Sequence, residues 1–324
     1  MEMLQDSFGR PVSSLRVQVN TTCNFKCFFC HMEGTGIQAN QLSRDEIIRI
    51  IKVAAKLGIN KVKFTGGEPT LRSDIVDIVR ETRSIVSGEI SMTTNGTRLK
   101  SIAPELKKAG LDRINISMHS IDPGAFEFIT GMDALDRVVE GIRAAQNAGL
   151  NPVKVNFVAL KGINEDQIWK MIQNSADNDY TLQIIEYEVP RELEQSEDFL
   201  KYHYPLDSLE NELSVRSIKT EHNSLHDRPL FNVPVPGGTA RVEIVRPMHN
   251  YHFCDNCTRM RVTSLGELKP CLMKNDNYTS VFGASRKQHT DGDIENAFIQ
   301  ATNKREPYWR REEANESQVL CDAS

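Results

Sequence analysis

Three cysteines lie close together near the start of the chain, in the stretch T-C-N-F-K-C-F-F-C-H-M-E-G at residues 22–34. Cys23, Cys27 and Cys30 form the pattern C-x3-C-x2-C. Thiolates are the standard ligands of iron–sulfur clusters, so three of them on one loop can hold three irons of a [4Fe–4S] cluster. The fourth iron then keeps an open coordination position, where a substrate or cofactor can bind.

Two other uses of these thiols remain open: a zinc site and free buried cysteines. Zinc sites usually take four ligands from separated pairs such as C-x2-C. His31 directly follows Cys30 and could act as a fourth ligand, but all four ligands would then lie within nine residues. This spacing fits a zinc site poorly, so the cluster is the favoured interpretation.

A second cysteine triplet lies in F-C-D-N-C-T-R-M-R-V-T-S-L-G-E-L-K-P-C-L, where Cys254 and Cys257 form C-x2-C and Cys271 follows a predicted hairpin. A second three-cysteine cluster with an open iron is the favoured interpretation. The alternative is a zinc site completed by His249 or His252, because both histidines lie just upstream.

Two arginines, Arg259 and Arg261, follow Cys257 directly and are two residues apart. On an extended segment they face the same side, because the side-chain period of a strand is two. Paired guanidinium groups suit a phosphate or another oxyanion, which they bind through bidentate hydrogen bonds. The alternative for either arginine alone is a place on a solvated, charged face.

The elements that must position these residues alternate between strands and helices. Short β-branched or alternating runs predict strands at 15–19, 61–65, 89–93, 113–118, 153–160 and 181–186. Capping and stop signals predict helices at 43–58, 73–86, 99–109, 135–148 and 166–174. Six such units predict an α/β fold, an incomplete (βα)6 TIM-like barrel with its chemistry at the C-terminal ends of the strands.

The sequence changes character after Pro190, so we expect a barrel domain at 1–190 and a smaller C-terminal region at 191–324. A helix at 205–212 and strands at 215–219, 230–235 and 239–245 predict a small antiparallel α+β unit that carries the second cluster. The stretch after residue 295 predicts a helix followed by a polar end.

Composition limits the function classes. The chain has 324 residues, 39% hydrophobic content and a net charge of −5, which is ordinary for a globular protein and argues against a general nucleic-acid coat. No apolar run predicts a signal peptide or a membrane span. Seven cysteines, with Cys321 outside both triplets, favour metal binding in a reducing compartment over a disulfide framework, so we expect a cytoplasmic protein.

The first triplet, with Phe29 just before its last cysteine, is similar to the signature of radical S-adenosylmethionine (SAM) enzymes. With both triplets, the chain resembles the archaeal form of the molybdenum cofactor biosynthesis GTP 3′,8-cyclase family. Matching stretches run from F-G-R-P-V at Phe8 to Cys271 and Leu272. The resemblance implies two [4Fe–4S] clusters, SAM bound to the open iron of the first, and a 5′-deoxyadenosyl radical formed by one-electron cleavage.

The resemblance also implies residue roles. Cys23, Cys27 and Cys30 would hold the SAM cluster, and Cys254, Cys257 and Cys271 the substrate cluster. Residues that match SAM-binding positions are Phe29, Gly67 and Ser117; those that match GTP-binding positions are Arg16, Lys63, Thr93, Lys154, Arg259 and Arg261. Without the resemblance, Arg16 and Lys154 would each be interpreted as surface strand residues.

The chain departs from the family pattern at three places. Glu188 stands where many relatives carry a methionine that packs on SAM, and Gln183 stands where an arginine often binds phosphate. The Gly-Gly tail of the family is absent, because this chain ends V-L-C-D-A-S.

The implied reaction is abstraction of the C3′ hydrogen of GTP and attack of C3′ on guanine C8, the first step of molybdenum cofactor biosynthesis. The expected partners are GTP, an external electron donor and the downstream cyclic pyranopterin monophosphate synthase. We expect a monomer or homodimer, with neither nucleic acid nor a membrane as partner.

One alternative to this function is another radical SAM enzyme with an auxiliary cluster that modifies a peptide or protein. A second is a zinc-stabilised binding module on an inactive barrel.

Overall fold

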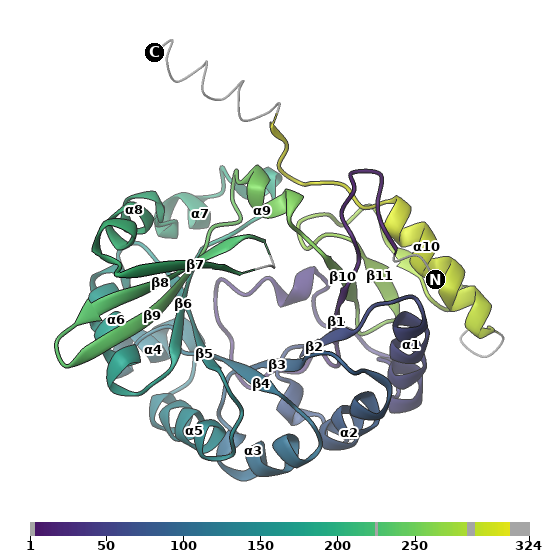
Figure 1. Cartoon of the computed structure of the whole chain (residues 1–324), viewed down its shortest axis with the longest axis horizontal. Helices are drawn as coiled ribbons and strands as arrows, with labels where there is room; N and C mark the ends of the chain where they lie inside the picture. The colour runs from purple at the N-terminus through teal and green to yellow at the C-terminus, as the bar shows by residue number, and fades with distance from the viewer. Residues whose placement is uncertain (1–3, 224–225, 284–288, 312–324) are drawn as a thin grey trace.

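Six parallel strands pair in sequence order and curve into an open barrel wall (Figure 1). The computed structural model describes residues 4–223, 226–283 and 289–311. The six strands are β1 (Ser14–Gln18), β2 (Lys61–Thr65), β3 (Ile90–Thr94), β4 (Arg113–Ser117), β5 (Val153–Ala159) and β6 (Thr181–Glu186). The expected incomplete barrel is therefore confirmed, and strands β2 and β6 have the predicted bounds.

The inner and outer faces of this wall differ in polarity, because side chains alternate along each strand. On β1, Leu15 and Val17 belong to the main hydrophobic core, whereas Arg16 lines the barrel interior. The register places Arg16 between Lys63 of β2 and Arg261 of a strand that comes much later in the chain. Buried parallel sheets are usually apolar on both faces, so this polar interior indicates space for a ligand.

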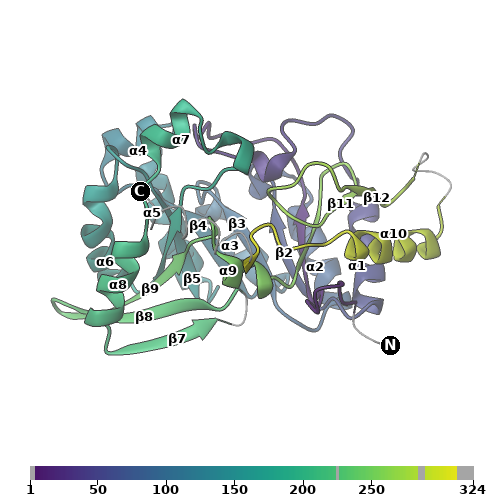
Figure 2. The same cartoon turned by 90° about the horizontal axis from the view of Figure 1, so that it is seen from above.

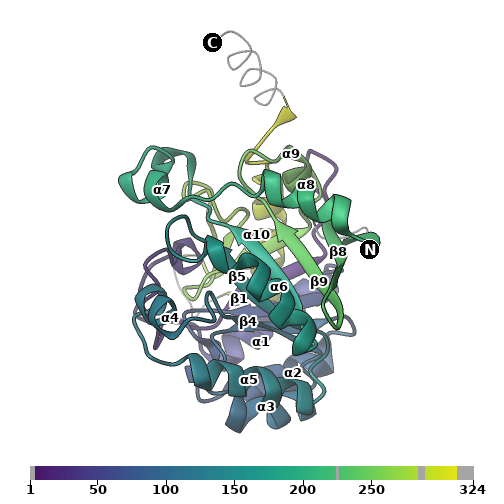
Figure 3. The same cartoon turned by 90° about the vertical axis from the view of Figure 1, so that its left-hand side faces the viewer.

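Helices cover the outer face of the wall, as Figures 1 and 3 show. They are α1 (Arg44–Lys56), α2 (Ile75–Ile85), α3 (Leu99–Lys108), α4 (Pro123–Thr130), α5 (Leu135–Asn147) and α6 (Ile168–Asp177). Helix α1 begins at the predicted capping box of Ser43 and Glu46. Helix α4 was not expected, although its N-cap Asp122 and the following Pro123 are ordinary helix-start signals.

The strands after residue 190 extend the same sheet at both edges. They are β7 (Lys219–Asn223), β8 (Arg228–Val235), β9 (Gly238–Val245), β10 (Arg259–Val262), β11 (Glu267–Lys269) and β12 (Thr279–Ser280). Strand β9 pairs in parallel with β6, and β8 and β7 follow it in antiparallel order. Strand β10 pairs in parallel with β1 at the opposite edge, and β11 and β12 follow. The segments far apart in sequence thus form the two side walls of one barrel (Figure 1).

The later helices are α7 (Glu197–Tyr202), α8 (Asp207–Arg216), α9 (Tyr251–Asp255) and α10 (Asp291–Asn303). The predicted strand at 215–219 is wrong, because Val215 and Arg216 end α8 and the strand begins only at Lys219. Helix α10 packs beside α1 (Figure 2), where Arg49 Nε lies 2.7 Å from Asp291 Oδ1. Residues 312–324, which belong to the polar end predicted after the last helix, lie outside the described residues. None of the helices in the described part of the chain has the length and apolar character needed to cross a membrane.

Candidate active site

The first cysteine triplet lies on the loop that leaves the C-terminal end of β1. Burial is the largest cause that raises the pKa of the Cys27 thiol to about 12, and Cys30 and Cys23 raise it further because all three thiols are near one another. Backbone N–H groups donate hydrogen bonds to two of the sulfurs: Phe25 to Cys23 Sγ at 3.3 Å and Met32 to Cys30 Sγ at 3.4 Å. Hydrogen bonds to sulfur are typical of thiolates in iron–sulfur sites.

The zinc alternative at this loop finds no support in the geometry. His31 Nδ1 accepts a hydrogen bond from Glu33 N–H at 3.1 Å, so this ring nitrogen is already occupied. Within the described ranges, no three His, Cys, Asp or Glu side chains converge as the ligands of a single metal ion would. A four-iron cluster needs no such convergence, because each cysteine binds a different iron. The three-thiol donor set therefore fits a [4Fe–4S] cluster with one open iron.

The G-G-E-P stretch after β2 packs tightly against the cysteine loop. A Cβ added to Gly67 would lie 2.4 Å from Thr22 O, a backbone atom that cannot move aside. Glu68 is fully buried and accepts hydrogen bonds from Thr94 Oγ1 and Asn95 N–H, both at 2.6 Å. Glu68 thus ties the loop after β2 to the loop after β3, a role that the sequence did not reveal.

The second triplet comes from α9, the turn after it and the segment after β11. The thiols of Cys254, Cys257 and Cys271 interact electrostatically, so they too lie near one another. Burial opposes ionisation of Cys257, but the neighbouring cations, Arg259 first, outweigh it and lower the pKa of this thiol. This donor set also fits three irons of a [4Fe–4S] cluster.

The histidines proposed as zinc ligands at this triplet have other surroundings. His249 Nε2 lies 2.9 Å from Glu194 Oε2, and its ring packs 4.0 Å from the Trp309 ring. The His252 ring packs 4.1 Å from the Tyr251 ring. Neither observation supports a histidine completing this site.

Both triplets line one cavity of about 340 Å³ at the C-terminal ends of the strands, which we call the upper cavity. Phe29, Gly67, Thr93 and Ser117 also line it. The Phe29 ring meets the His119 ring edge-on, with 5.0 Å between their centres. The structure thus brings together predicted residues from five separate parts of the sequence.

Four of the predicted cations also line the upper cavity: Arg16, Lys63, Arg259 and Arg261. Among the described residues, neither Lys63 nor Arg259 forms an ion pair with a carboxylate; Lys63 Nζ instead donates a hydrogen bond to Asn115 Oδ1 at 2.9 Å. Burial, followed by the neighbouring cations, lowers the pKa of Lys63 well below its usual value. Buried cations without a counter-ion are costly, so this cluster is suited to an anionic ligand.

Glu33 supplies the carboxylate nearest to Arg16 and Arg261, at 3.5 Å and 3.7 Å. Two arginines thus share one carboxylate. The buried Nε atoms of Arg16 and Arg261 have no hydrogen-bond partner in the described structure. Unsatisfied guanidinium donors beside a cavity are consistent with the anion site predicted from the paired arginines.

Lys154 lies apart from the other predicted cations. It lines a second cavity of about 510 Å³ at the N-terminal ends of the strands, the lower cavity, which shares Arg16, Lys63 and Arg259 with the upper one. Lys154 Nζ lies 2.6 Å from Glu243 Oε2. Lys154 therefore shares the lining of the lower cavity with three of the other predicted cations.

Two of the three departures from the family pattern, Glu188 and Gln183, also face the barrel interior. Glu188 lines the upper cavity, and burial raises the pKa of its carboxyl group. Gln183 lines both cavities and donates a hydrogen bond to Glu243 Oε2 at 2.9 Å.

Sequence reasoning missed Glu33, Glu68 and Glu243, because nothing in their local sequence shows which distant cations or backbone groups they meet. Cys321 lies outside the described residues.

Comparisons with known proteins agree with this architecture. Residues 17–174 match the radical SAM superfamily, and residues 180–311 match the family described as Molybdenum Cofactor Synthesis C. The solved structure of Streptococcus suis SuiB bound to the precursor peptide SuiA is similar in fold, with a TM-score of 0.66 and 17% identity over 93% of this chain and 67% of that one.

Relatives that match nearly the whole chain identify the family within this superfamily. A protein of Thermoplasma volcanium named "Probable GTP 3′,8-cyclase" is 51% identical over 98% of this chain and 97% of its own length. A protein of Thermococcus kodakarensis with the same name is 46% identical over 95% of this chain and 100% of its own length. This chain therefore belongs to the GTP 3′,8-cyclase family within the radical SAM superfamily.

Proposed function

We propose that this chain is a lyase that converts GTP into (8S)-3′,8-cyclo-7,8-dihydroguanosine 5′-triphosphate, the first step of molybdenum cofactor biosynthesis. The observation that carries the proposal is the upper cavity, in which two three-cysteine sites face a cluster of buried cations. A cavity of this composition can hold SAM at one metal site and an anionic nucleotide beside it. No single motif of the sequence accounts for both reactants.

The two triplets have different roles in this proposal. Cys23, Cys27 and Cys30 hold the first [4Fe–4S] cluster, and Cys254, Cys257 and Cys271 hold the second. When bound, the first cluster would supply the one-electron reduction that cleaves SAM, and the resulting 5′-deoxyadenosyl radical would take the C3′ hydrogen of GTP. The protein positions the reactants and keeps water away from them, which is the main contribution expected of an enclosed site.

The other side chains bind the reactants. Phe29, Gly67 and Ser117 contact SAM; the absence of a side chain on Gly67 lets the loop approach closely. The GTP-binding residues are Arg16, Lys63, Thr93, Lys154, Arg259 and Arg261. The cations among them act on the triphosphate through charge-assisted hydrogen bonds. The lower cavity then accommodates the end of the triphosphate nearest to Lys154.

The chain needs partners for a complete turnover. An external electron donor supplies two electrons per turnover, one for SAM cleavage at the first cluster and one that, with a proton, reduces the cyclised radical to the dihydro product. A cyclic pyranopterin monophosphate synthase takes the product. The protein works as a monomer or homodimer in the cytoplasm, where a reducing environment preserves thiolate ligands. Residues 1–190 form the SAM-cleaving part, and residues 191–324 supply the second cluster.

Anaerobic assays of the reconstituted protein test this proposal. We expect about eight irons per chain, as two four-iron clusters require, and 5′-deoxyadenosine formation that increases when GTP is added. The rival, a radical SAM enzyme that modifies a peptide or protein, predicts no stimulation by GTP and more iron if further clusters are present. Zinc in place of iron at the second triplet would support the alternative of an inactive barrel with a binding module.

A further inference from the structure

The lower cavity has an unusual charge balance. Seven basic side chains line it, namely Arg16, Lys61, Lys63, Arg113, Lys154, Arg228 and Arg259, whereas Glu89 is the one acidic side chain in its lining. Arg113 is neutralised by Glu89, since two of its nitrogens lie 2.7 Å from the two carboxylate oxygens. Of the other six cations, Arg16 contacts Glu33, and Lys154 and Arg228 contact Glu243. Two carboxylates thus oppose six cations, and this positive balance is suited to a polyanion.

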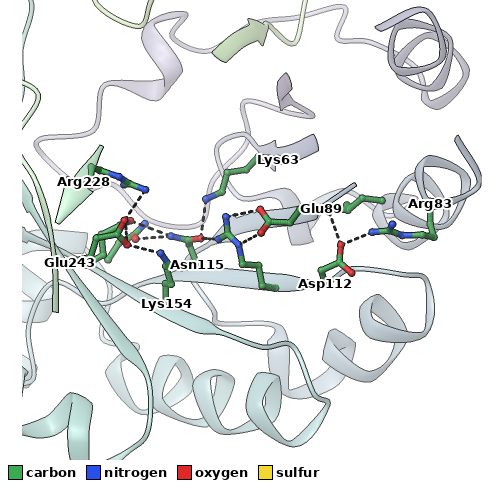
Figure 4. A network of polar contacts seen from close by, with 12 residues as sticks. Lys63, Arg83, Glu89, Asp112, Asn115, Lys154, Arg228 and Glu243 are labelled. Carbon is green, nitrogen blue, oxygen red and sulfur yellow. Dashed lines mark hydrogen bonds and ion pairs between the residues drawn. The ribbon is translucent and has the colours of Figure 1, made fainter. Parts of the chain in front are cut away.

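Arg228 is a cation of this lining that the sequence did not single out. It begins β8 and lines both cavities. Its guanidinium Nη2 lies 2.8 Å from Glu243 Oε1, and its side chain is 14% exposed. Figure 4 shows Arg228 and Lys154 on either side of Glu243, with Lys63 and Asn115 nearby. Arg228 can therefore contact a ligand in either cavity.

Glu243 holds this part of the site in place. Its carboxylate is fully buried behind the cavity lining, and Lys154 and Gln183 bind one oxygen while Arg228 binds the other. One carboxylate thus serves two cations. Burial, the largest cause, lowers the pKa of both Lys154 and Arg228, and Arg113 lowers each of them further. This arrangement orients both cations but leaves net positive charge for a ligand.

We propose that Arg228 contacts the phosphate groups of the nucleotide and that Glu243 positions Arg228 and Lys154 for this contact. The inference rests on the proposed function for the identity of the nucleotide. It adds a guanidinium from the start of β8, which the hydrogen bond from His226 N–H to Asn256 O (3.1 Å) brings near the segment that leads into Arg259 of β10. Two forked groups in the lining of one cavity can bind neighbouring groups of a phosphate chain. Gln183, a neutral amide, binds Glu243 and leaves this role to Arg228.

Binding measurements on the anaerobically reconstituted protein test the role of Arg228. The variants are Arg228→Gln, Arg228→Lys and a control, Arg241→Gln. Arg241 is also on a wall strand, β9, but its side chain is 42% exposed and pairs with Asp179 outside both cavities. The ligands are GTP, guanosine and inorganic triphosphate, each measured by isothermal titration calorimetry.

We expect Arg228→Gln to weaken the binding of GTP and inorganic triphosphate by roughly 10- to 100-fold, as the loss of a charged hydrogen bond predicts. Guanosine binding should change less than about twofold, because only the phosphates meet Arg228. Arg228→Lys should recover part of the loss, and Arg241→Gln should behave as the wild type. Unchanged GTP binding in Arg228→Gln, or an equal loss for guanosine and GTP, would overturn the assignment.

The same data separate this inference from the proposed function. If the wild type binds inorganic triphosphate in an Arg228-dependent manner but does not convert GTP, the cyclase proposal fails and the role of Arg228 in phosphate binding stands. If the wild type converts GTP and Arg228→Gln binds and converts it equally well, the cyclase proposal stands and the role of Arg228 falls.

Discussion

The Glu33 carboxylate lies 3.5 Å from the Arg16 guanidinium and so connects the loop of the first cysteine triplet to strand β1. Glu33 comes three residues after Cys30, and Arg261 of β10 approaches the same carboxylate at 3.7 Å. The loop that holds the first cluster and the cations that face the nucleotide are thus in direct contact. A substitution in the cluster loop should therefore affect the cations that face the nucleotide, and the reverse.

This contact predicts a pH-dependent contribution to stability. Burial favours the protonated form of Glu33, but Arg16 and then Arg261 outweigh it and lower the pKa of Glu33 to about 2, from an ordinary value of 4.5. A lowered folded-state pKa stabilises the fold above pH 4.5, and this contribution is lost as the pH falls toward 2. The shift corresponds to about 3 kcal/mol at neutral pH.

The variant Glu33→Gln tests this prediction. We expect its free energy of unfolding, measured by urea denaturation of the cluster-free protein, to be lower than that of the wild type by about 3 kcal/mol at pH 7. The difference should shrink steadily below pH 4.5. A difference that stays constant from pH 7 to pH 3 would contradict the ion pairing.

Gly67→Ala should distort the first cysteine loop. The new Cβ would lie 2.4 Å from Thr22 O and 2.7 Å from Thr21 O, which are both backbone atoms. We expect a loss of stability of about 1–3 kcal/mol, as overpacking usually costs, and weaker SAM binding. Gly124→Ala is the control, because its Cβ comes no closer than 3.4 Å to Asp122 Oδ1. Thermal unfolding measures the loss of stability, and SAM titration measures the change in affinity. Equal stability and equal SAM affinity of the two variants would refute the close approach of Gly67 to the Thr22 backbone.

Arg259→Ala should impair GTP conversion without abolishing SAM cleavage. Arg259 lines both cavities and lies among the cations that we assign to the triphosphate. We expect kcat/KM for GTP to fall by about 100-fold, in line with the loss of a charged contact, while SAM cleavage without GTP persists. Iron content serves as the control, since it must remain at the wild-type level. Loss of SAM cleavage in a variant that keeps its iron would count against the assignment.

Cys257→Ala and Cys27→Ala should remove different clusters. We expect each variant to keep about four irons per chain, because the triplets are separate donor sets. Cys257→Ala should retain GTP-independent SAM cleavage and lose GTP conversion, whereas Cys27→Ala should lose both activities. Iron analysis and 5′-deoxyadenosine chromatography measure these outcomes. Retention of eight irons by Cys257→Ala would exclude the second triplet as a cluster site.

The local elements could be predicted because their signals are local. The Ser43–Glu46 capping box marked the start of α1, and the alternating residues 61–65 formed strand β2 with the predicted bounds. By contrast, the pairing of β9 with β6 and of β10 with β1 could not be predicted. A period of two identifies a strand but carries no information about its distant partner.

The candidate site could be predicted only in part for the same reason. The six cysteines and the paired arginines stood out through spacing, and the structure gathers them around the upper cavity. Glu33 and Glu243 had no such signal, because a buried carboxylate is explained by the cations it meets in space. Lys154 lines the lower cavity together with Arg16, Lys63 and Arg259, which were also predicted to bind GTP. The sequence does not show how far along the barrel axis each of these side chains lies.

The central claim is that this cavity brings a SAM-derived radical to C3′ of GTP. The most direct test is anaerobic turnover of the reconstituted, reduced protein with SAM and GTP deuterated at C3′, followed by mass spectrometry of the 5′-deoxyadenosine. If the radical takes the C3′ hydrogen, 5′-deoxyadenosine gains one deuterium. Formation of 5′-deoxyadenosine without deuterium would contradict the claim, because the radical would then act on another atom or another substrate.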